Sequence, residues 1–134
     1  MKRLLFLVLM TFCSLSWAEW ELCSIIGVGE EKISRYCDKS TIRKNGAISR
    51  MWNIINYSKL QTDSSGDRWM STKVLMAFNC REEATAVISL TGYSELMGNG
   101  KVVFTGTRQE REWQWEPIIP ESSGESVWKI VCGK

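Results

Sequence analysis

Five cysteines are the residues of this sequence best able to do chemistry, and their spacing argues against catalysis and metal binding. They are Cys13, Cys23, Cys37, Cys80 and Cys132. No two of them are separated by only two residues, so the sequence lacks the CxxC pattern typical of thiol exchange and of many zinc sites. The sequence also contains no histidine, which is the usual general base and the commonest metal ligand. No catalytic, cofactor-binding or metal-binding residue is therefore predicted.

Carboxylate pairs are the other groups that could support catalysis, because two facing acids can act as general acid and base. The candidates are Glu30 with Glu31, Glu82 with Glu83, and Glu110 with Glu112. All of them fall in turns or polar runs, where solvated surface charge is the expected state. We therefore predict a protein that is not an enzyme.

The first 18 residues have the pattern of a bacterial secretory signal peptide. Lys2 and Arg3 precede an apolar run over residues 4–12, and small residues surround Ala18. The apolar run is about half the length of the ~20 residues that a membrane-spanning helix needs. Residues 1–18 are therefore predicted to be removed on export.

The rest of the chain, residues 19–134, is predicted to form a single exported domain. Cys13 is not expected to be lipidated, because bulky Phe12 precedes it where lipoprotein processing requires a small residue. No transmembrane segment is expected in the exported chain. Its predicted location is the periplasm or, after release, the outside or surface of a Gram-negative-type bacterium.

The exported chain is predicted to carry no net charge. Removal of Lys2 and Arg3 lowers the 17 basic residues to 15, which match the 15 acidic residues. This balance gives no electrostatic attraction to nucleic acid or to a membrane surface. Arg43, Lys44 and Arg50 form a local basic group that could face an anionic partner, although a solvated rim is the commoner role of such a group.

Four cysteines remain in the exported chain, and an even number in an oxidising compartment predicts two disulfides, for which three pairings exist. The segment WELCSIIGVGEEKISRYCD contains two extended runs around a glycine turn, so it is predicted to be a β-hairpin. With the turn centred on Glu30, Cys23 lies directly opposite Cys37, close enough for a bond between them.

The segment SSGESVWKIVCGK is predicted to be a helix that packs on the rest of the domain. Ser122 and Glu125 have capping-box spacing, and Gly133 is a typical C-terminal stop. Between these caps apolar residues recur at helical spacing and place Cys132 on the buried face. In STKVLMAFNC, alternation of apolar residues also directs Cys80 towards the core. A bond between Cys80 and Cys132 is therefore favoured.

Together these elements predict an α+β fold, with an antiparallel β-sheet of about six strands, a C-terminal α-helix packed on one face, and disulfides as staples. The third predicted strand, AISRMWNIINYSK, is apolar on both faces. Either both faces of the sheet are covered, or one face packs against a partner. A homodimer is one arrangement that would provide the partner.

Six of the seven tryptophans lie in the exported chain. Trp52 and Trp128 have the sequence context of core residues. Trp113 and Trp115 lie on the same side of the extended segment WQWEP, among polar neighbours. These two are predicted either to pack within the protein or to form an exposed surface that binds a partner or a second copy.

Five short motifs occur in an order that extends over nearly the whole exported chain. They are YCDKSTIRKNG, RMWNIINY, STKVLMAFNC, YSELMGNGKVV and WEPIIPESSGESVWKIVC. Each motif is weak alone, but their order and spacing are specific. Together they resemble the surface-adhesin protein E family of small exported bacterial proteins.

The resemblance implies an antiparallel sheet of about six strands and a C-terminal helix tied down by Cys80 and Cys132, so that Cys23 and Cys37 are an addition to the family pattern. It also implies a dimeric surface adhesin that binds extracellular matrix and host proteins. Haem binding is also attributed to the best-known member of the family, but without histidine the ligand here would have to be Tyr, Met or Cys, and no cofactor is predicted. The alternative prediction is a periplasmic binding or inhibitor module, for instance one that blocks a cell-wall hydrolase through the loop QTDSSGDRW.

Overall fold

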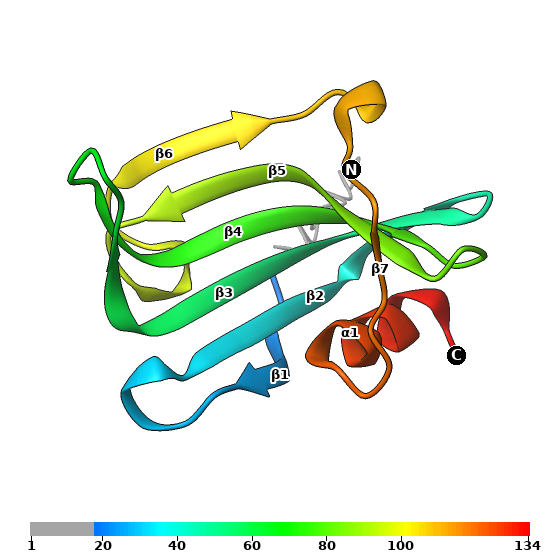
Figure 1. Cartoon of the computed structure of the whole chain (residues 1–134), viewed down its shortest axis with the longest axis horizontal. Helices are drawn as coiled ribbons and strands as arrows, with labels where there is room; N and C mark the ends of the chain where they lie inside the picture. The colour runs from blue at the N-terminus through cyan, green and yellow to red at the C-terminus, as the bar shows by residue number, and fades with distance from the viewer. Residues whose placement is uncertain (1–17) are drawn as a thin grey trace, which may run out of the picture.

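The protein is a curled antiparallel sheet with one helix packed across it (Figure 1). The structure, a computed structural model, describes residues 18–134. Residues 1–17 of the predicted signal peptide lie outside the described residues. The elements are β1 (Glu21–Ile26), η1 (Gly29–Glu31), β2 (Ile33–Asn45), β3 (Ile48–Thr62), β4 (Arg68–Asn79), β5 (Ala84–Tyr93), η2 (Leu96–Gly98), β6 (Val102–Thr107), η3 (Glu110–Glu112), β7 (Glu116–Pro117) and α1 (Ser123–Cys132).

The strands β1 to β6 are neighbours in chain order, so each pairs with the next as a meander. Short turns make this order possible. The β2–β3 hairpin, for example, is closed by the pair Asn45 and Ile48, with Gly46 at a positive φ of 61°, a conformation that glycine adopts at little cost. The predicted α+β fold is confirmed. The two-residue strand β7, which pairs with β5, is an addition that the sequence did not indicate.

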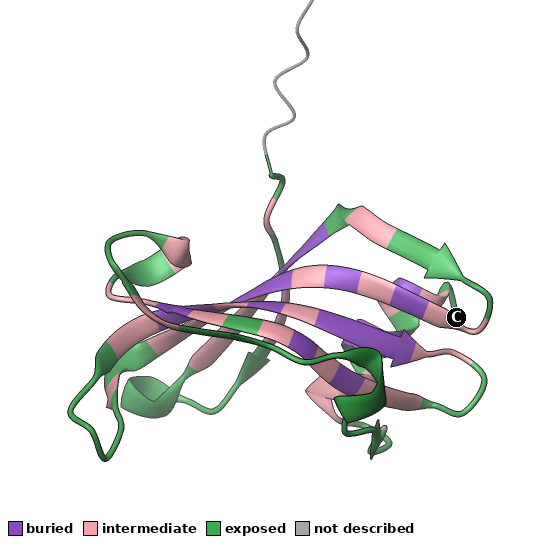
Figure 2. Ribbon diagram, turned by 90° about the horizontal axis from the view of Figure 1, so that it is seen from above, coloured by how far each residue is buried: buried purple, intermediate pink, exposed green. Residues whose placement is uncertain are grey.

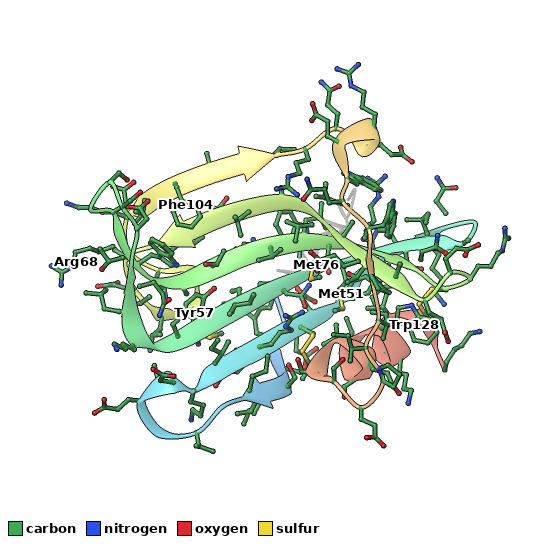
Figure 3. All side chains as sticks on the ribbon, in the orientation of Figure 1. Met51, Tyr57, Arg68, Met76, Phe104 and Trp128 are labelled. Atoms are coloured by element: carbon green, nitrogen blue, oxygen red, sulfur yellow. A yellow bond between two sulfur atoms is a disulfide. The ribbon has the colours of Figure 1, made fainter. Side chains whose placement is uncertain are left out.

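The core lies between α1 and the middle strands. Met51 of β3 and Met76 of β4 are direct cross-strand partners and both are buried. Figure 3 shows them close to Trp128 of α1, whereas Tyr57 and Phe104 lie towards the far end of the sheet. The other members of the core are Cys37, Val74, Phe78, Val127 and Val131. Buried residues follow the middle strands, while turns and edges are exposed (Figure 2).

The helix α1 begins and ends where its capping residues predict. The Oγ of Ser122 accepts a hydrogen bond from the N–H of Glu125 at 3.2 Å, and Gly133 ends the helix at a φ of 68°. The Glu125 carboxylate reaches back to the N–H of Glu121 at 2.7 Å. Trp128 fixes the helix to the sheet, since its Nε1–H donates to the carbonyl oxygen of Asn79 at 3.0 Å. Within residues 18–134 no helix is both long enough and apolar enough to cross a bilayer.

Two disulfides join the pairs that the sequence favoured. Cys80, directly after β4, is bonded to Cys132 in the last turn of α1, with a Cα–Cα distance of 5.6 Å. Cys23 of β1 is bonded to Cys37 of β2, with a Cα–Cα distance of 5.9 Å. The first bond ties the helix to the sheet, and the second ties the edge strand to its neighbour.

The predicted register of the first hairpin is wrong. Cys37 lies opposite Glu21 rather than Cys23, and the pairing shifts by one residue between Leu22 and Ser24. Cys23 therefore occupies a β-bulge, which brings its side chain to Cys37 although the two residues do not face each other. Two features produce this difference: the turn is centred between Gly29 and Glu30, since Ile26 pairs with Ile33, and the bulge shifts the pairing by a further residue.

Candidate functional site

The sheet has a second face, opposite α1, that the helix does not cover. Side chains alternate along a strand, so Arg50, Trp52 and Ile54 of β3 point away from the buried core residues Met51 and Asn53. Direct cross-strand partners share a face. This helix-free face consists of the three β3 residues and their partners along the adjoining strands, namely Tyr36, Asp38, Arg43, Lys73, Leu75, Ala77 and Ala86.

Trp52 is thus not the core residue that its sequence context suggested. It is half-buried and lies on the helix-free face. The reason is the alternation of β3, which gives the core positions to its neighbours Met51 and Asn53. Trp128, by contrast, is in the core as predicted, with 4% of its surface exposed.

The loop that contains η2 covers one end of the helix-free face. The N–H of Met97 donates to Oδ1 of Asn56 at 2.9 Å, and the N–H of Gly98 donates to Oγ of Ser71 at 2.9 Å. A methyl group on Gly98 would be in ordinary van der Waals contact with Cδ1 of Ile54, at 3.6 Å, so the loop lies directly against this side chain. Ile54 is consequently buried. At this end the apolar third strand is covered within the chain and needs no partner.

Trp113, Trp115 and Arg50 form an aromatic cluster at the opposite end of the same face. The two indole rings meet edge to face, with their centroids 5.9 Å apart. The Arg50 guanidinium lies 5.1 Å from the centroid of Trp113, a cation–π contact. Trp113 is positioned by its own Nε1–H, which donates to the carbonyl oxygen of Arg108 at 3.2 Å. Trp115 keeps 40% of its surface exposed, so the cluster packs internally on one side and faces solvent on the other.

Between these two ends, Lys73 lies against two further indole rings. Its Nζ is 5.0 Å from the centroid of Trp52 and 5.9 Å from that of Trp20. These side chains border an open cavity of about 400 Å³. The residues that line it are Ala18, Trp20, Asp38, Ser40, Thr41, Arg43, Trp52 and Lys73.

A β-bulge in β2 builds one wall of this cavity. The pairing of β2 with β3 is interrupted between Asp38 and Arg43. Oδ1 of Asp38 accepts hydrogen bonds from the N–H of Ser40 at 3.1 Å and from its Oγ at 2.5 Å. Oγ of Thr41 donates to the carbonyl oxygen of Asp38 at 2.6 Å and accepts from the N–H of Trp52 at 3.0 Å. The run of Asp, Ser and Thr thus replaces the missing ladder bonds with side-chain bonds.

The helix-free face carries cations that have no acidic partner within the described part of the chain. The ion pairs of the described chain join Lys39 to Glu21 and Lys129 to Glu125. Neither pair involves Arg43, Arg50 or Lys73. Arg43 and Arg50 are direct cross-strand partners, a pairing of like charges that costs stability. A face of half-buried indoles and unpaired cations fits an anionic partner.

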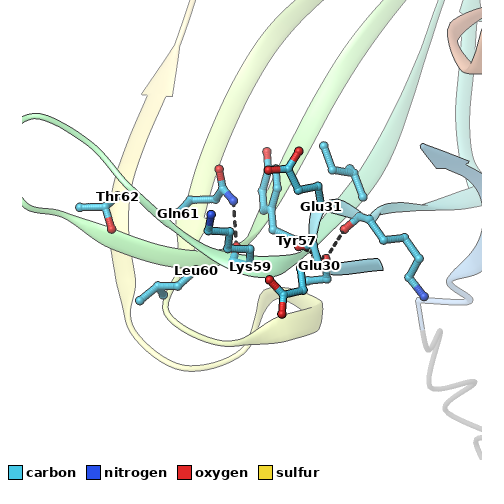
Figure 4. Close-up of a pocket in the computed structure, with 10 residues that line it drawn as sticks. Glu30, Glu31, Tyr57, Lys59, Leu60, Gln61 and Thr62 are labelled. Carbon is cyan, nitrogen blue, oxygen red and sulfur yellow. Dashed lines mark hydrogen bonds between the residues drawn. The ribbon is translucent and has the colours of Figure 1, made fainter. Parts of the chain in front are cut away.

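A second and larger cavity, of about 510 Å³, lies at the turn of the first hairpin (Figure 4). It lies between this turn and the end of β3. Oγ of Ser58 bonds to the carbonyl oxygens of Glu30 and Lys32 at 2.8 Å each, and Nε2 of Gln61 donates to the carbonyl oxygen of Lys59 at 2.8 Å. The charges of its acidic and lysine side chains offset one another, so this cavity attracts a charged ligand less strongly than the helix-free face does.

The loop QTDSSGDRW, which the alternative prediction placed in an inhibitor contact, is a turn that satisfies its own polar groups. Oδ1 of Asp63 accepts from the N–H and Oγ of Ser65 at 3.0 and 2.7 Å, and from the N–H of Asp67 at 2.9 Å. The bond from the Ser65 hydroxyl lowers the pKa of Asp63 below its ordinary value. Nor does any group of three His, Cys, Asp or Glu side chains suited to a metal occur among residues 18–134.

Sequence reasoning named part of this face and missed the rest. It selected Trp113 and Trp115, and it grouped Arg43 with Arg50. It missed Trp20 and Lys73. Lys73 could have been found from strand alternation, because it lies two residues from Leu75 on the same face. Trp20 precedes β1 and follows no periodic pattern, so only the structure could place it.

Lys44, the third member of the predicted basic group, is separated from the other two. It pairs with Ser49 on the face that carries the core, so it does not join Arg43 and Arg50. The predicted group is therefore divided between the two faces of the sheet.

The chain matches the family model described as surface-adhesin protein E over residues 24–133. No curated protein sequence matches it significantly. Among solved structures it is similar to crystal form II of Haemophilus influenzae protein E, with a TM-score of 0.57 and 15% identity over 74% of this chain and 80% of that chain. A structure of protein E from non-typeable Haemophilus influenzae gives a TM-score of 0.54 and 15% identity over 74% of this chain and 69% of that chain. At this identity the structural likeness establishes the fold.

Proposed function

Because the chain belongs to the surface-adhesin protein E family, we propose that it is an exported, non-enzymatic binding protein of adhesin type. Its partners are extracellular matrix or host proteins, and they contact the helix-free face. The observation that supports this most is the cluster of Trp113, Trp115 and Arg50, in which aromatic surface and an unpaired cation remain partly exposed. Tryptophan and arginine are the residues most enriched where protein interfaces gain their energy.

Binding to immobilised matrix proteins tests the proposal directly. The double variant Trp113→Ala, Trp115→Ala should lower the affinity at least tenfold, since truncation of a central aromatic commonly costs 2 kcal/mol or more. The matched control is Val102→Ser, which changes a residue that is 59% exposed on the distant strand β6. If both variants bind as the unaltered protein does, the aromatic cluster is not the contact surface.

Location decides between the adhesin and the alternative periplasmic binding or inhibitor module. We propose that residues 1–18 are removed as a signal peptide, that residues 19–134 form one domain, and that the mature protein is displayed at the cell surface. Protease added to whole cells should then degrade it. Release by osmotic shock alone would instead indicate the periplasm, and a pull-down from periplasmic extract would then identify the partner.

A homodimer is part of the same proposal. The edge strand β1 exposes Leu22 and Ile25 by 51% and 52% of their surfaces, and an exposed apolar edge is a surface that a second sheet can pair with. Light scattering at high concentration measures the oligomeric state. A strictly monomeric species would remove the dimer from the proposal without affecting the adhesin role.

A further inference from the structure

We propose that the cavity beside the β2 bulge binds an acidic saccharide, meaning a sugar ring that carries a carboxylate. The inference deepens the proposed function by naming a ligand chemistry, and it rests on that function for its biological setting. The site is the cavity of about 400 Å³ between Trp20, Trp52, Lys73 and the bulge. Its volume is within the range of about 300–1,000 Å³ typical of small-molecule sites.

Two fixed cations give the cavity its preference for an anion. Lys73 is held against two indole rings, which restricts a side chain that would otherwise move freely. Arg43 is held by hydrogen bonds from Nη1 to the carbonyl oxygens of Ser40 and Ile42, at 2.9 Å each. Those bonds leave the other guanidinium N–H groups of Arg43 to donate elsewhere. No carboxylate within residues 18–134 forms an ion pair with either cation. A carboxylate that enters the cavity would gain charge-assisted hydrogen bonds from preorganised donors.

The one acid in the cavity, Asp38, offsets only one of the two cations, so the cavity keeps a net positive charge. Asp38 is only 2% exposed, and Ser40 donates both of its hydrogen bonds to Oδ1. The second carboxylate oxygen is not used by either bond. It is an acceptor at the cavity wall that suits a ligand hydroxyl. The cavity therefore combines donors for a carboxylate with an acceptor for a hydroxyl.

The indole rings favour a sugar over an extended acidic peptide. Trp20 and Trp52 are half-buried, so each presents part of a flat apolar surface to a ligand. Such a surface suits the flat side of a sugar ring, whose C–H groups are apolar and whose hydroxyls point outwards. The cavity is also a single hollow, and all of its eight lining residues except Ala18 belong to the exported chain, whereas a peptide requires a groove or a free sheet edge.

Titration of the exported chain, residues 19–134, with defined sugars tests the proposal. Glucuronic acid and N-acetylneuraminic acid should quench tryptophan fluorescence in a saturable way. Glucose and galactose should bind at least tenfold more weakly, because they lack the carboxylate. Acetate should not saturate, because it lacks the ring. Raising the salt concentration should weaken the binding of the acidic sugars, as expected for a partly exposed ion pair.

The variants Lys73→Gln and Arg43→Gln should each weaken binding of the acidic sugars at least tenfold. Lys101→Gln, which removes an exposed lysine outside the cavity, should leave binding unchanged. Thermal melting should show that each variant is folded, so that a loss of binding can be distinguished from a loss of structure.

Three results would overturn the inference: no saturation by either acidic sugar, equal binding of neutral sugars, or tighter binding of hexaglutamate than of both acidic sugars. None of these bears on the aromatic cluster. If matrix binding still depends on Trp113 and Trp115, the proposed function survives the failure of the saccharide site. If the protein does not bind matrix proteins but does bind the acidic sugars, the saccharide site survives the failure of the proposed function.

Discussion

The two faces of this one sheet differ in almost every physical respect, although the same strands build both. The face under α1 is buried and mainly apolar, and two disulfides lie at its borders. The helix-free face has half-buried indoles, unpaired cations and a bulge that opens a cavity. The difference indicates that stability is concentrated on one face, so the other can carry features that cost stability, such as the facing pair Arg43 and Arg50.

The largest effect should follow from breaking the bond that closes the covered face. The double variant Cys80→Ser, Cys132→Ser should lose about 4 kcal/mol of stability, because the bond closes a loop of more than 50 residues in the unfolded chain. The ten-residue helix is too short to be stable alone. Hydrogen exchange should therefore show loss of protection over residues 125–132, and unchanged protection would contradict this account of the staple.

The double variant Cys23→Ser, Cys37→Ser is its matched control. This variant should lose about 3 kcal/mol of stability, because the bond between Cys23 and Cys37 closes a shorter loop than the bond between Cys80 and Cys132. Protection of α1 should remain, since this bond joins β1 to β2 and does not hold the helix.

Adjacent residues on β3 give a direct test of the contrast between the faces. Met51→Ala should cost about 3 kcal/mol, because Met51 is fully buried and its loss leaves a cavity in the core. Trp52→Ala removes a larger side chain but should cost only about 1 kcal/mol, because Trp52 is only half-buried on the opposite face. Urea denaturation measures both values. A Trp52→Ala cost equal to or above that of Met51→Ala would show that the helix-free face is also structural.

Arg35 is an exception on the covered face. Its Nε is buried and has no hydrogen-bond partner within the described chain, and Nη1 donates a weak hydrogen bond to the sulfur of Met76, at 3.5 Å. Burial lowers the pKa of the guanidinium, which means that the charge is disfavoured there. Arg35→Met should raise stability by about 1 kcal/mol in urea denaturation, as a similar apolar shape replaces an unpaired charge. A loss of stability in Arg35→Met would show that the guanidinium has a favourable partner.

The smallest expected effect is the response of α1 to acid. Hydrogen bonds from Lys129 and from the N–H of Glu121 lower the pKa of Glu125 below its ordinary value of 4.5. The charged carboxylate thus favours the folded state, and its contribution is complete above pH 4.5 and is lost as the pH falls through the lower folded value. In Glu125→Gln this part of the acid response of α1 should disappear. Hydrogen exchange of the first helical turn at several pH values measures it, and an identical acid response in the variant would disprove the role of Glu125.

Sequence reasoning succeeded where a local pattern and the tertiary fold agree. Ser122 and Gly133 mark the ends of α1 because caps act within one turn of the chain. The pairing of Cys80 with Cys132 followed from two periodicities that both point inwards. Irregular pairing was not predictable in the same way. A bulge shifts the register by one residue at Cys23, and another opens β2 after Asp38, yet neither leaves a periodic mark in the sequence.

The order of the disulfides has a consequence for how the protein matures after export. Among the four cysteines of the described chain, the first bonds with the second and the third with the fourth. A polypeptide that crosses a membrane from its N-terminus presents its thiols in that same order. The only non-native bond between successive cysteines of the described chain would be the error of joining Cys37 to Cys80. The early closure of Cys23 with Cys37 prevents that error, because it consumes Cys37 before Cys80 arrives. This order of bonds is therefore one that an oxidase can produce with little help from a disulfide isomerase.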